Sequence, residues 1–135
     1  MRVCYDTNQL VQILASKGKS LQFRRLLTID GVTHVTSEHV LKESEAILVS
    51  KFGRTRQFAR SKARLLSKLS DVVKPARVEP VSRDPDDDQV LAGAVAGRAD
   101  YLVTADDDLL VIKEHCGVRI VSPAEFEGII RKRAA

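Results

Sequence analysis

The stretch that fixes the expected fold is Asp84–Leu110, DPDDDQVLAGAVAGRADYLVTADDDLL. Asp84 and Pro85 have the residue types of a helix N-cap and first helical position, and the Ala-rich run after them continues the helix. Residues 100–105 then read as a short buried strand, and the apolar spacing after Asp106 indicates another helix. The stretch therefore predicts a helix–strand–helix unit that carries acids at both helix starts.

The rest of the chain repeats this alternation of strand and helix. Strands are expected at 2–6, 32–37, 71–81 (weak, because Pro75 and Pro80 interrupt it), 100–105 and 118–122. Helices are expected at 9–18, 20–31, 38–52, after Thr55, at 89–98, 106–117 and 123–132. Such alternation predicts an α/β fold with a mainly parallel sheet of about five strands and helices on both faces.

Length and composition fit one globular domain over residues 1–135, with 44% apolar and 30% charged residues. No apolar run is long enough to cross a membrane, and the N-terminus does not have the pattern of a signal peptide. Cys4 and Cys116 are far apart in the sequence, which disfavours a disulfide framework or thiolate zinc site. A reducing cytoplasm is the expected location.

Acidic residues follow the carboxyl ends of four expected strands, where open α/β sheets bind ligands. They are Asp6, then Glu38, Glu43 and Glu45, then Asp84 and Asp86–Asp88, then Asp106–Asp108. Taken singly, the two aspartate clusters are explained as helix starts, since acids favour helix N-termini. Together the four strand ends predict a negative pocket whose repulsion a cation would relieve.

Helix geometry separates some of these acids. At 100° per residue, Asp87 faces the buried side of its helix, Asp88 lies at the edge of that side and Asp86 turns toward solvent. Glu43 and Glu45 border their buried face equally, so the pattern does not choose between them. Oxygen ligands suit Mg²⁺ or Mn²⁺, and none of the candidate ligands at the strand ends is a histidine or a cysteine, which argues against zinc.

Three segments, VCYDTNQLVQIL (3–14), TSEHVLKESEAIL (36–48) and the opening stretch, resemble the PIN-domain ribonucleases, most closely the VapC-like toxins of toxin–antitoxin pairs. The similarity runs over nearly the whole chain. It implies a three-layer α/β/α fold with strand order 3-2-1-4-5, and RNA cleavage that depends on one or two Mg²⁺ or Mn²⁺ ions. It also implies an antitoxin as partner and makes a homodimer an expectation.

The resemblance assigns the metal-binding acids and their supporting polar residues. These are Asp6, Glu43, Asp87 and Asp106 as catalytic metal ligands, Asp88 and Asp108 as further candidates, and Asn8 and Thr104 as polar supports. Ala105 stands where the family more often has glycine, and Asp107 is an additional acid. Neither departure removes an expected ligand.

The charges of the chain are separated along the sequence. Seven bases and no acid lie between Glu45 and Asp71, whereas eight acids and one base lie between Asp84 and Asp108. We predict RNA-backbone contacts from the basic helix through Arg54, Arg56, Arg60, Lys62, Arg64 and Lys68. Two alternatives remain: a non-catalytic module that docks a basic partner, and a phosphoacceptor receiver domain, which lacks its expected lysine after the last strand.

Overall fold

Six strands form one twisted sheet in the computed structural model, which describes residues 1–15 and 31–134. They are β1 (Arg2–Tyr5), β2 (Thr33–Ser37), β3 (Asp71–Val73), β4 (Tyr101–Val103), β5 (Glu114–His115) and β6 (Val118–Val121). The order is β3-β2-β1-β4-β6-β5, and each neighbouring pair is parallel except β5 with β6. The mainly parallel sheet is confirmed. Its first five positions follow the expected order, with β6 as the fifth strand and β5 as an addition.

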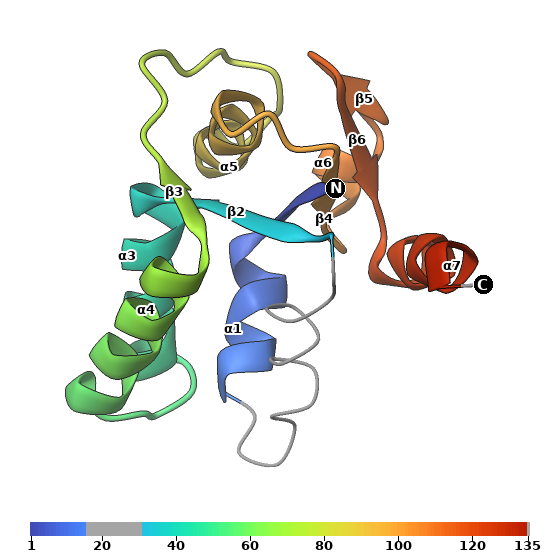
Figure 1. The fold of residues 1–135 in the computed structure, drawn as a ribbon. Coiled ribbons are helices and arrows are strands. Elements are labelled where there is room, and N and C mark those ends of the chain that lie inside the picture. The colour runs from blue at the N-terminus through green and yellow to red at the C-terminus, as the bar shows by residue number, and fades with distance from the viewer. Residues whose placement is uncertain (16–30, 135) are drawn as a thin grey trace.

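Helices cover both faces of this sheet (Figure 1). They are α1 (Thr7–Ala15), α3 (Glu38–Ser50), α4 (Arg56–Leu69), α5 (Pro85–Ala96), α6 (Asp107–Leu110) and α7 (Pro123–Ala134). Figure 1 shows α5 on one side of the strands and α1, α3 and α4 on the other. The helix expected at 20–31, and the expected helix end near Gly18, lie outside the described residues. Within the part of the chain that is described, no helix is long and apolar enough to span a membrane.

The central strands bury side chains on both faces, as expected for a parallel sheet covered on both sides. Val3, Val103 and Val121 pack with Phe126 of α7. Their strand neighbours Cys4, Leu102 and Ile120 belong to the larger core, which includes apolar residues of α1, α3, α4 and α5. Successive residues of a strand point to opposite faces, so this division fixes the register of the sheet. Because β1 and β4 are parallel neighbours, with Tyr5 paired to Val103, the residues that follow these two strands lie side by side at one edge of the sheet.

The helix predicted at 106–117 is wrong beyond its first turn. α6 ends at Leu110, and residues 114–119 form a tight antiparallel hairpin in which His115 pairs with Val118. The two loop residues, Cys116 and Gly117, both have positive φ angles of 49° and 83°. Positive φ at both loop positions is typical of a type I′ turn, whose twist matches that of the flanking strands. Gly117, directly before the β-forming run Val118–Val121, was the sequence signal for a turn here.

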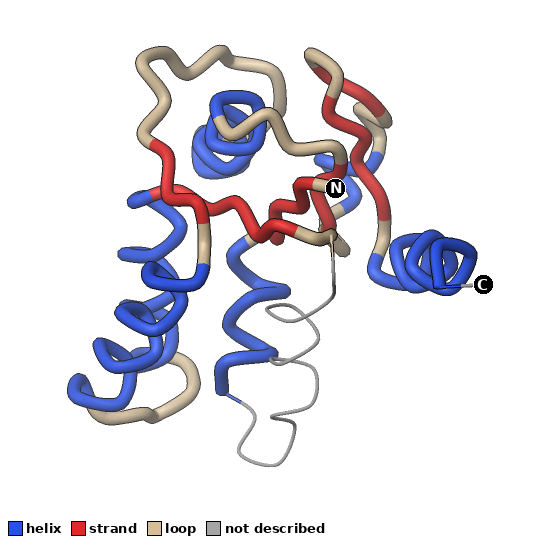
Figure 2. The backbone as a smooth tube through the Cα atoms, viewed as in Figure 1, coloured by secondary structure: helices blue, strands red, loops and turns tan. Residues whose placement is uncertain are grey.

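The strand expected over 71–81 is also shorter than predicted. β3 ends at Val73, and residues 74–84 run as an irregular segment from β3 to the start of α5 (Figure 2). Pro75 and Pro80 lie in this segment, and neither can donate a backbone hydrogen bond to a neighbouring strand. The acids at the start of α5 therefore follow a loop of eleven residues, 74–84, and do not directly follow a strand.

Candidate metal centre

Asp6 comes directly after β1 and is only 5% exposed. Its Oδ2 accepts a hydrogen bond of 2.8 Å from the hydroxyl of Thr104, which directly follows β4. The Thr104 Oγ1 in turn accepts a hydrogen bond of 3.0 Å from the backbone N–H of Asp106. The two central strand ends are therefore joined by side chains, and this contact fixes the position of the Asp6 carboxylate.

Asp87 and Asp106 face each other from the starts of α5 and α6. Together with Asp108 they offer carboxylate oxygens that all lie within 4.8 Å of one another. Asp87 is 5% exposed, and its buried Oδ2 has no hydrogen-bond partner. A buried carboxylate oxygen without a donor is costly, and a divalent cation would satisfy it. The oxygen-only donor set is the type that Mg²⁺ and Mn²⁺ prefer, so these residues fit such an ion.

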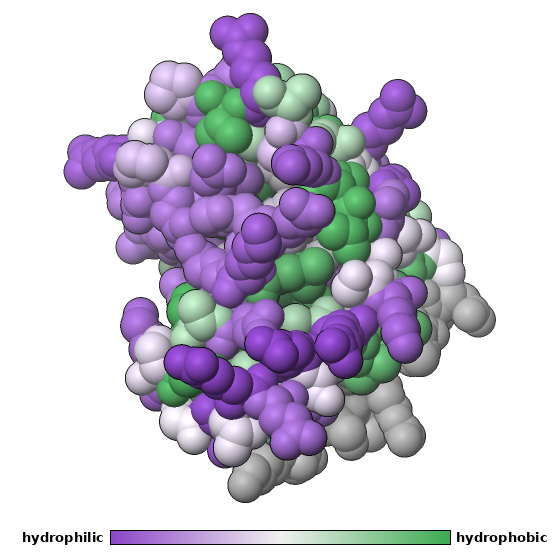
Figure 3. All heavy atoms as spheres, turned by 90° about the vertical axis from the view of Figure 1, so that its left-hand side faces the viewer, coloured by the Kyte–Doolittle hydropathy of each residue, from purple (hydrophilic) through white to green (hydrophobic). Residues whose placement is uncertain are grey.

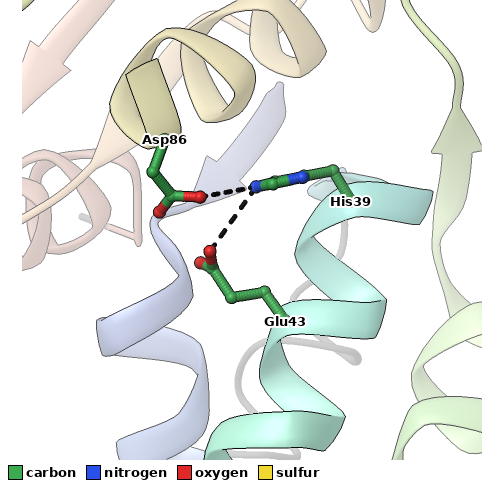
Figure 4. Close-up of side chains that lie close together, drawn as sticks. All are labelled: His39, Glu43 and Asp86. Carbon is green, nitrogen blue, oxygen red and sulfur yellow. Dashed lines mark hydrogen bonds and ion pairs between the residues drawn. The ribbon is translucent and has the colours of Figure 1, made fainter. Parts of the chain in front are cut away.

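A second group of donor atoms comes from α3 and α5 (Figure 4). His39 Nε2 lies 2.8 Å from Asp86 Oδ1 and 3.5 Å from Glu43 Oε2. Figure 4 shows the imidazole and the two carboxylates pointing toward one another from these two helices. The Asp86 side chain is 43% exposed, so it does face solvent in part, but the sequence did not predict that α3 presents a histidine to it. The structure also chooses between the two glutamates: Glu43 joins this group, whereas Glu45 pairs with Arg60 at 3.6 Å.

His39 is the functional candidate that sequence reasoning missed. It lies four residues before Glu43, so both side chains share one face of α3. That spacing was visible in the sequence. The contact that makes His39 part of the group is with Asp86, which is 47 residues away in the chain and could not be predicted from the spacing. The absence of histidine from the predicted site is therefore corrected: one of the chain's three histidines lies among the acids.

Electrostatic interactions link the two groups, because Asp6 interacts with a member of each. Burial raises the pKa of Asp6, and the charges of Asp106 and Asp86 add to that rise against the Thr104 hydrogen bond. Burial and the neighbouring Asp106 raise the pKa of Asp87 to about 7. Burial and interaction with Asp86 raise the pKa of Glu43 to about 7, and the same interaction lowers the pKa of Asp86. Carboxylates that repel one another in this way favour a bound cation.

Asp88 is buried as well, and one of its oxygens is used within the fold. Its Oδ1 accepts hydrogen bonds from the backbone N–H groups of Val81 and Ser82, at 2.9 and 2.7 Å. Asp84 caps α5 through a bond from the Asp86 N–H to its Oδ1, at 2.9 Å, as predicted. Asp88 thus holds the end of the 74–84 loop against α5.

The remaining predicted residues lie outside the pocket or at its edge. Asn8 is exposed on α1, and no hydrogen bond ties it to the acids within the described ranges 1–15 and 31–134. Asp107 is exposed and belongs to neither donor group. Thr7, the neighbour of Asn8 on α1, does interact with an acid of the site: its side chain lowers the pKa of Glu43.

The predicted RNA-binding residues lie on α4 or just before it. Arg56, Arg60, Arg64 and Lys68 are exposed. Arg54 differs, because its guanidinium donates a 2.5 Å hydrogen bond to the carbonyl of Ala15 at the described end of α1. Lys62 lies over the ring of Phe58, 5.4 Å from its centroid. The face of the molecule on the α3–α4 side is mostly hydrophilic, with apolar patches between the charged side chains (Figure 3).

Comparison with known proteins identifies the family to which this fold belongs. A family model described as PIN domain matches residues 2–108, and the chain belongs to this family. PIN nucleases typically use divalent metal ions. Membership sets aside the receiver-domain alternative. A search of curated protein sequences gives no match.

Three solved structures share the fold, which is that of VapC-like PIN proteins. VapBC2 from Rickettsia felis, bound to a DNA fragment from its promoter, has 14% identity and a TM-score of 0.62. VapBC-1 from nontypeable Haemophilus influenzae has 16% identity and a TM-score of 0.59; both alignments cover 90% of this chain and 98% of the other. Mycobacterium tuberculosis VapC20, a toxin that cleaves the sarcin–ricin loop, has 19% identity and a TM-score of 0.59. That alignment covers 87% of this chain and 98% of the other.

Proposed function

We propose that this protein is a metal-dependent endoribonuclease that hydrolyses phosphodiester bonds in RNA. The observation that carries the proposal is that Asp6, Asp87 and Asp106 interact with one another, and that Asp86 links Asp6 to Glu43 of a fourth segment. Three of these carboxyls have raised pKa values, and Asp87 has a buried oxygen without a partner. Helix capping explains single acids at helix starts, including Asp6 directly before α1, but it does not explain Glu43 or the interactions among these acids.

The residues divide the work of such a site. Asp6, Asp87 and Asp106 would hold Mg²⁺ or Mn²⁺, with Asp108 at the rim. The ion, when bound, lowers the pKa of a water and neutralises charge on the phosphoryl oxygens. Thr104 orients Asp6 by its hydrogen bond. Glu43 would position the attacking water or bind a second ion, from the neighbouring group that it forms with His39 and Asp86.

Substrate binding needs positive charge elsewhere, because the carboxylates alone would repel RNA phosphates. The exposed bases of α4, Arg56, Arg60, Arg64 and Lys68, form a basic face that suits a phosphate backbone. We assign the RNA contacts to these four residues. Arg54 is instead bound to a backbone carbonyl and holds α4 against α1.

We infer further that the protein is the toxin of a toxin–antitoxin pair. Two of the structurally similar proteins are VapBC complexes, and a third is a toxin that cleaves an RNA loop. An antitoxin would then be the cognate partner, and the acidic pocket suits an inserted Arg or Lys side chain. A homodimer is a further expectation from the family.

The test is cleavage of a panel of structured and single-stranded RNAs with Mg²⁺, Mn²⁺ or a chelator, by the wild type and by Asp6→Asn. Asparagine keeps an oxygen that can accept the Thr104 hydrogen bond, so the variant should fold. We expect cleavage only with metal, and only by the wild type. Mn²⁺ should also raise the Tm of the wild type, because a ligand that binds only the native state stabilises it.

Two results would overturn the proposal. One is undiminished cleavage by Asp6→Asn, which would place the activity elsewhere or in a contaminant. The other is a wild type that binds RNA but does not cleave any member of the panel with either metal. That second result would favour the alternative of a non-catalytic module.

A further inference from the structure

The donor group of His39, Glu43 and Asp86 differs in kind from the oxygen-only group of Asp87, Asp106 and Asp108 (Figure 4). One donor atom is an imidazole nitrogen, and all three atoms lie within 4.8 Å of one another. His39 and Glu43 are held on one face of α3, and Asp86 is fixed by the capped start of α5. The three side chains are half-buried, so solvent can still reach the point between them.

The spacing of these atoms suits a small divalent ion. With bonds of about 2.1 Å, neighbouring ligands of a metal ion lie about 3 Å apart. The separations from His39 Nε2, 2.8 Å to Asp86 Oδ1 and 3.5 Å to Glu43 Oε2, bracket that value. Little rearrangement is therefore needed to bring all three atoms onto one ion.

An independent observation comes from the floor of this group. Thr7, at the start of α1, is 2% exposed, and its Oγ1 makes no hydrogen bond of ordinary geometry. The hydroxyl interacts with the Glu43 carboxyl without forming such a bond. A buried hydroxyl without a partner is rare, and it would find one in a ligand or a metal-bound water at this point.

We propose that His39, Glu43 and Asp86 form a second cation position, which takes a transition-metal ion such as Mn²⁺ or Zn²⁺ in preference to Mg²⁺. Imidazole is a good ligand for transition metals, whereas Mg²⁺ prefers oxygen ligands and water. His39 is then the residue that sets the metal preference of the pocket. The inference rests on the proposed function only through Glu43, which both assignments share.

The competing explanation is that protonated His39 is itself the cation between two carboxylates. The two explanations differ in what happens to the imidazole when metal is added. Direct coordination puts the nitrogen on the ion and requires a neutral ring, whereas an internal imidazolium never contacts the metal. The difference can be measured without any RNA.

The experiment uses the full chain without a histidine tag, stripped of metal and then loaded with Mn²⁺. Pulsed electron paramagnetic resonance detects ¹⁴N coupling from a directly bound imidazole. We expect this coupling in the wild type and in His115→Gln, and its loss in His39→Gln. His115 is the matched control, because it too lies near a glutamate, Glu79 at 3.8 Å, but outside the pocket. Calorimetric titration should show at least a tenfold loss of Zn²⁺ affinity in His39→Gln and less than a threefold change for Mg²⁺.

Absence of ¹⁴N coupling in the wild type, or its persistence in His39→Gln, overturns this inference. A His39→Gln variant that binds Zn²⁺ as tightly as the wild type does so as well. Neither result touches the proposed function, which fails only through the cleavage assays with the wild type and Asp6→Asn. A melting curve of each variant separates loss of a ligand from loss of the fold.

Discussion

The starts of α5 and α6 are built by the same local rule, yet they use their acids differently. In each helix an aspartate N-cap accepts a bond of 2.9 Å from the N–H two residues later, from Asp86 to Asp84 and from Asp108 to Asp106. Asp84 caps and is exposed. Asp106 caps α6 and also faces Asp87 in the carboxylate pocket. In α5 the capping residue, Asp84, is not a candidate metal ligand. In α6 one residue, Asp106, is both the cap and a candidate ligand.

The contrast continues along α5. Its three acids after the cap point to three different places: Asp86 to His39, Asp87 to Asp106, and Asp88 to the loop. Successive residues of a helix are 100° apart, so a run of identical side chains must be distributed around the axis. The three acids at the start of α5 therefore have different partners, and variants of single residues should show what each one contributes.

The largest expected difference is between Asp106→Asn and Asp84→Asn. Asparagine caps a helix about as well as aspartate, so both variants should keep their folds. Asp106→Asn removes a carboxylate from the pocket and should lower cleavage roughly 10³-fold, equivalent to about 4 kcal/mol of transition-state stabilisation. Asp84→Asn should stay within about twofold of the wild type, as should Asp107→Asn, a control one residue away from Asp106. Equal losses in Asp84→Asn and Asp106→Asn would mean that the two helix starts do not differ in function.

Local patterns in the sequence were sufficient to predict a mainly parallel sheet and the inward position of Asp87, because both depend on periodicity that neighbouring residues encode. The strand order came from the family resemblance, and the sequence did not predict β5. It did not predict that Asp86 meets His39, because that contact joins two helices whose relative position is set by the sheet between them. It also did not choose between Glu43 and Glu45, since the choice depends on Arg60 in the next helix.

The next largest effect is expected at Asp88. Asp88→Ala leaves two backbone N–H groups, those of Val81 and Ser82, without their charged acceptor, and the site is buried. We expect a loss of about 3 kcal/mol in the free energy of unfolding, or roughly 10 °C in Tm for a chain of this size. Asp88→Asn, which keeps the acceptor oxygen, should lose much less. If Asp88→Ala instead lowered metal affinity without lowering Tm, Asp88 would be a ligand and not a loop anchor.

The loop itself explains why the sequence left Asp88 undecided. Residues 74–84 have no regular hydrogen-bonding pattern, so nothing in their spacing shows where their N–H groups point. Two of those groups end at Asp88 only because the loop turns back onto α5. The helix pattern places Asp88 at the edge of the buried side of α5. It does not show that the backbone of the 74–84 loop donates hydrogen bonds to this residue.

The smallest effect, and the one that separates Asp87 from its neighbours, is a pH dependence of stability in metal-free protein. Asp87 has a pKa of about 7 in the folded protein, above its ordinary value, so the folded state holds a proton there that the unfolded state releases near pH 4. The destabilisation by this residue is absent at low pH and grows as pH rises to about 7. Asp87→Asn should remove it and stabilise the metal-free protein by about 1–2 kcal/mol at pH 8, below what the full pKa shift implies because water screens the pocket.

The comparison must be made between variants, because His34 acts in the opposite direction. Burial lowers the pKa of His34 to about 4, so its contribution to stability is lost as pH falls below about 6.5. Subtracting the Tm of Asp87→Asn from that of the wild type, at each pH from 5 to 8 in chelator, cancels the His34 effect. We expect the difference to grow with pH and to shrink when Mn²⁺ is added to the wild type. A difference that stays constant with pH would place the Asp87 carboxylate in solvent and remove the physical reason for a cation beside it.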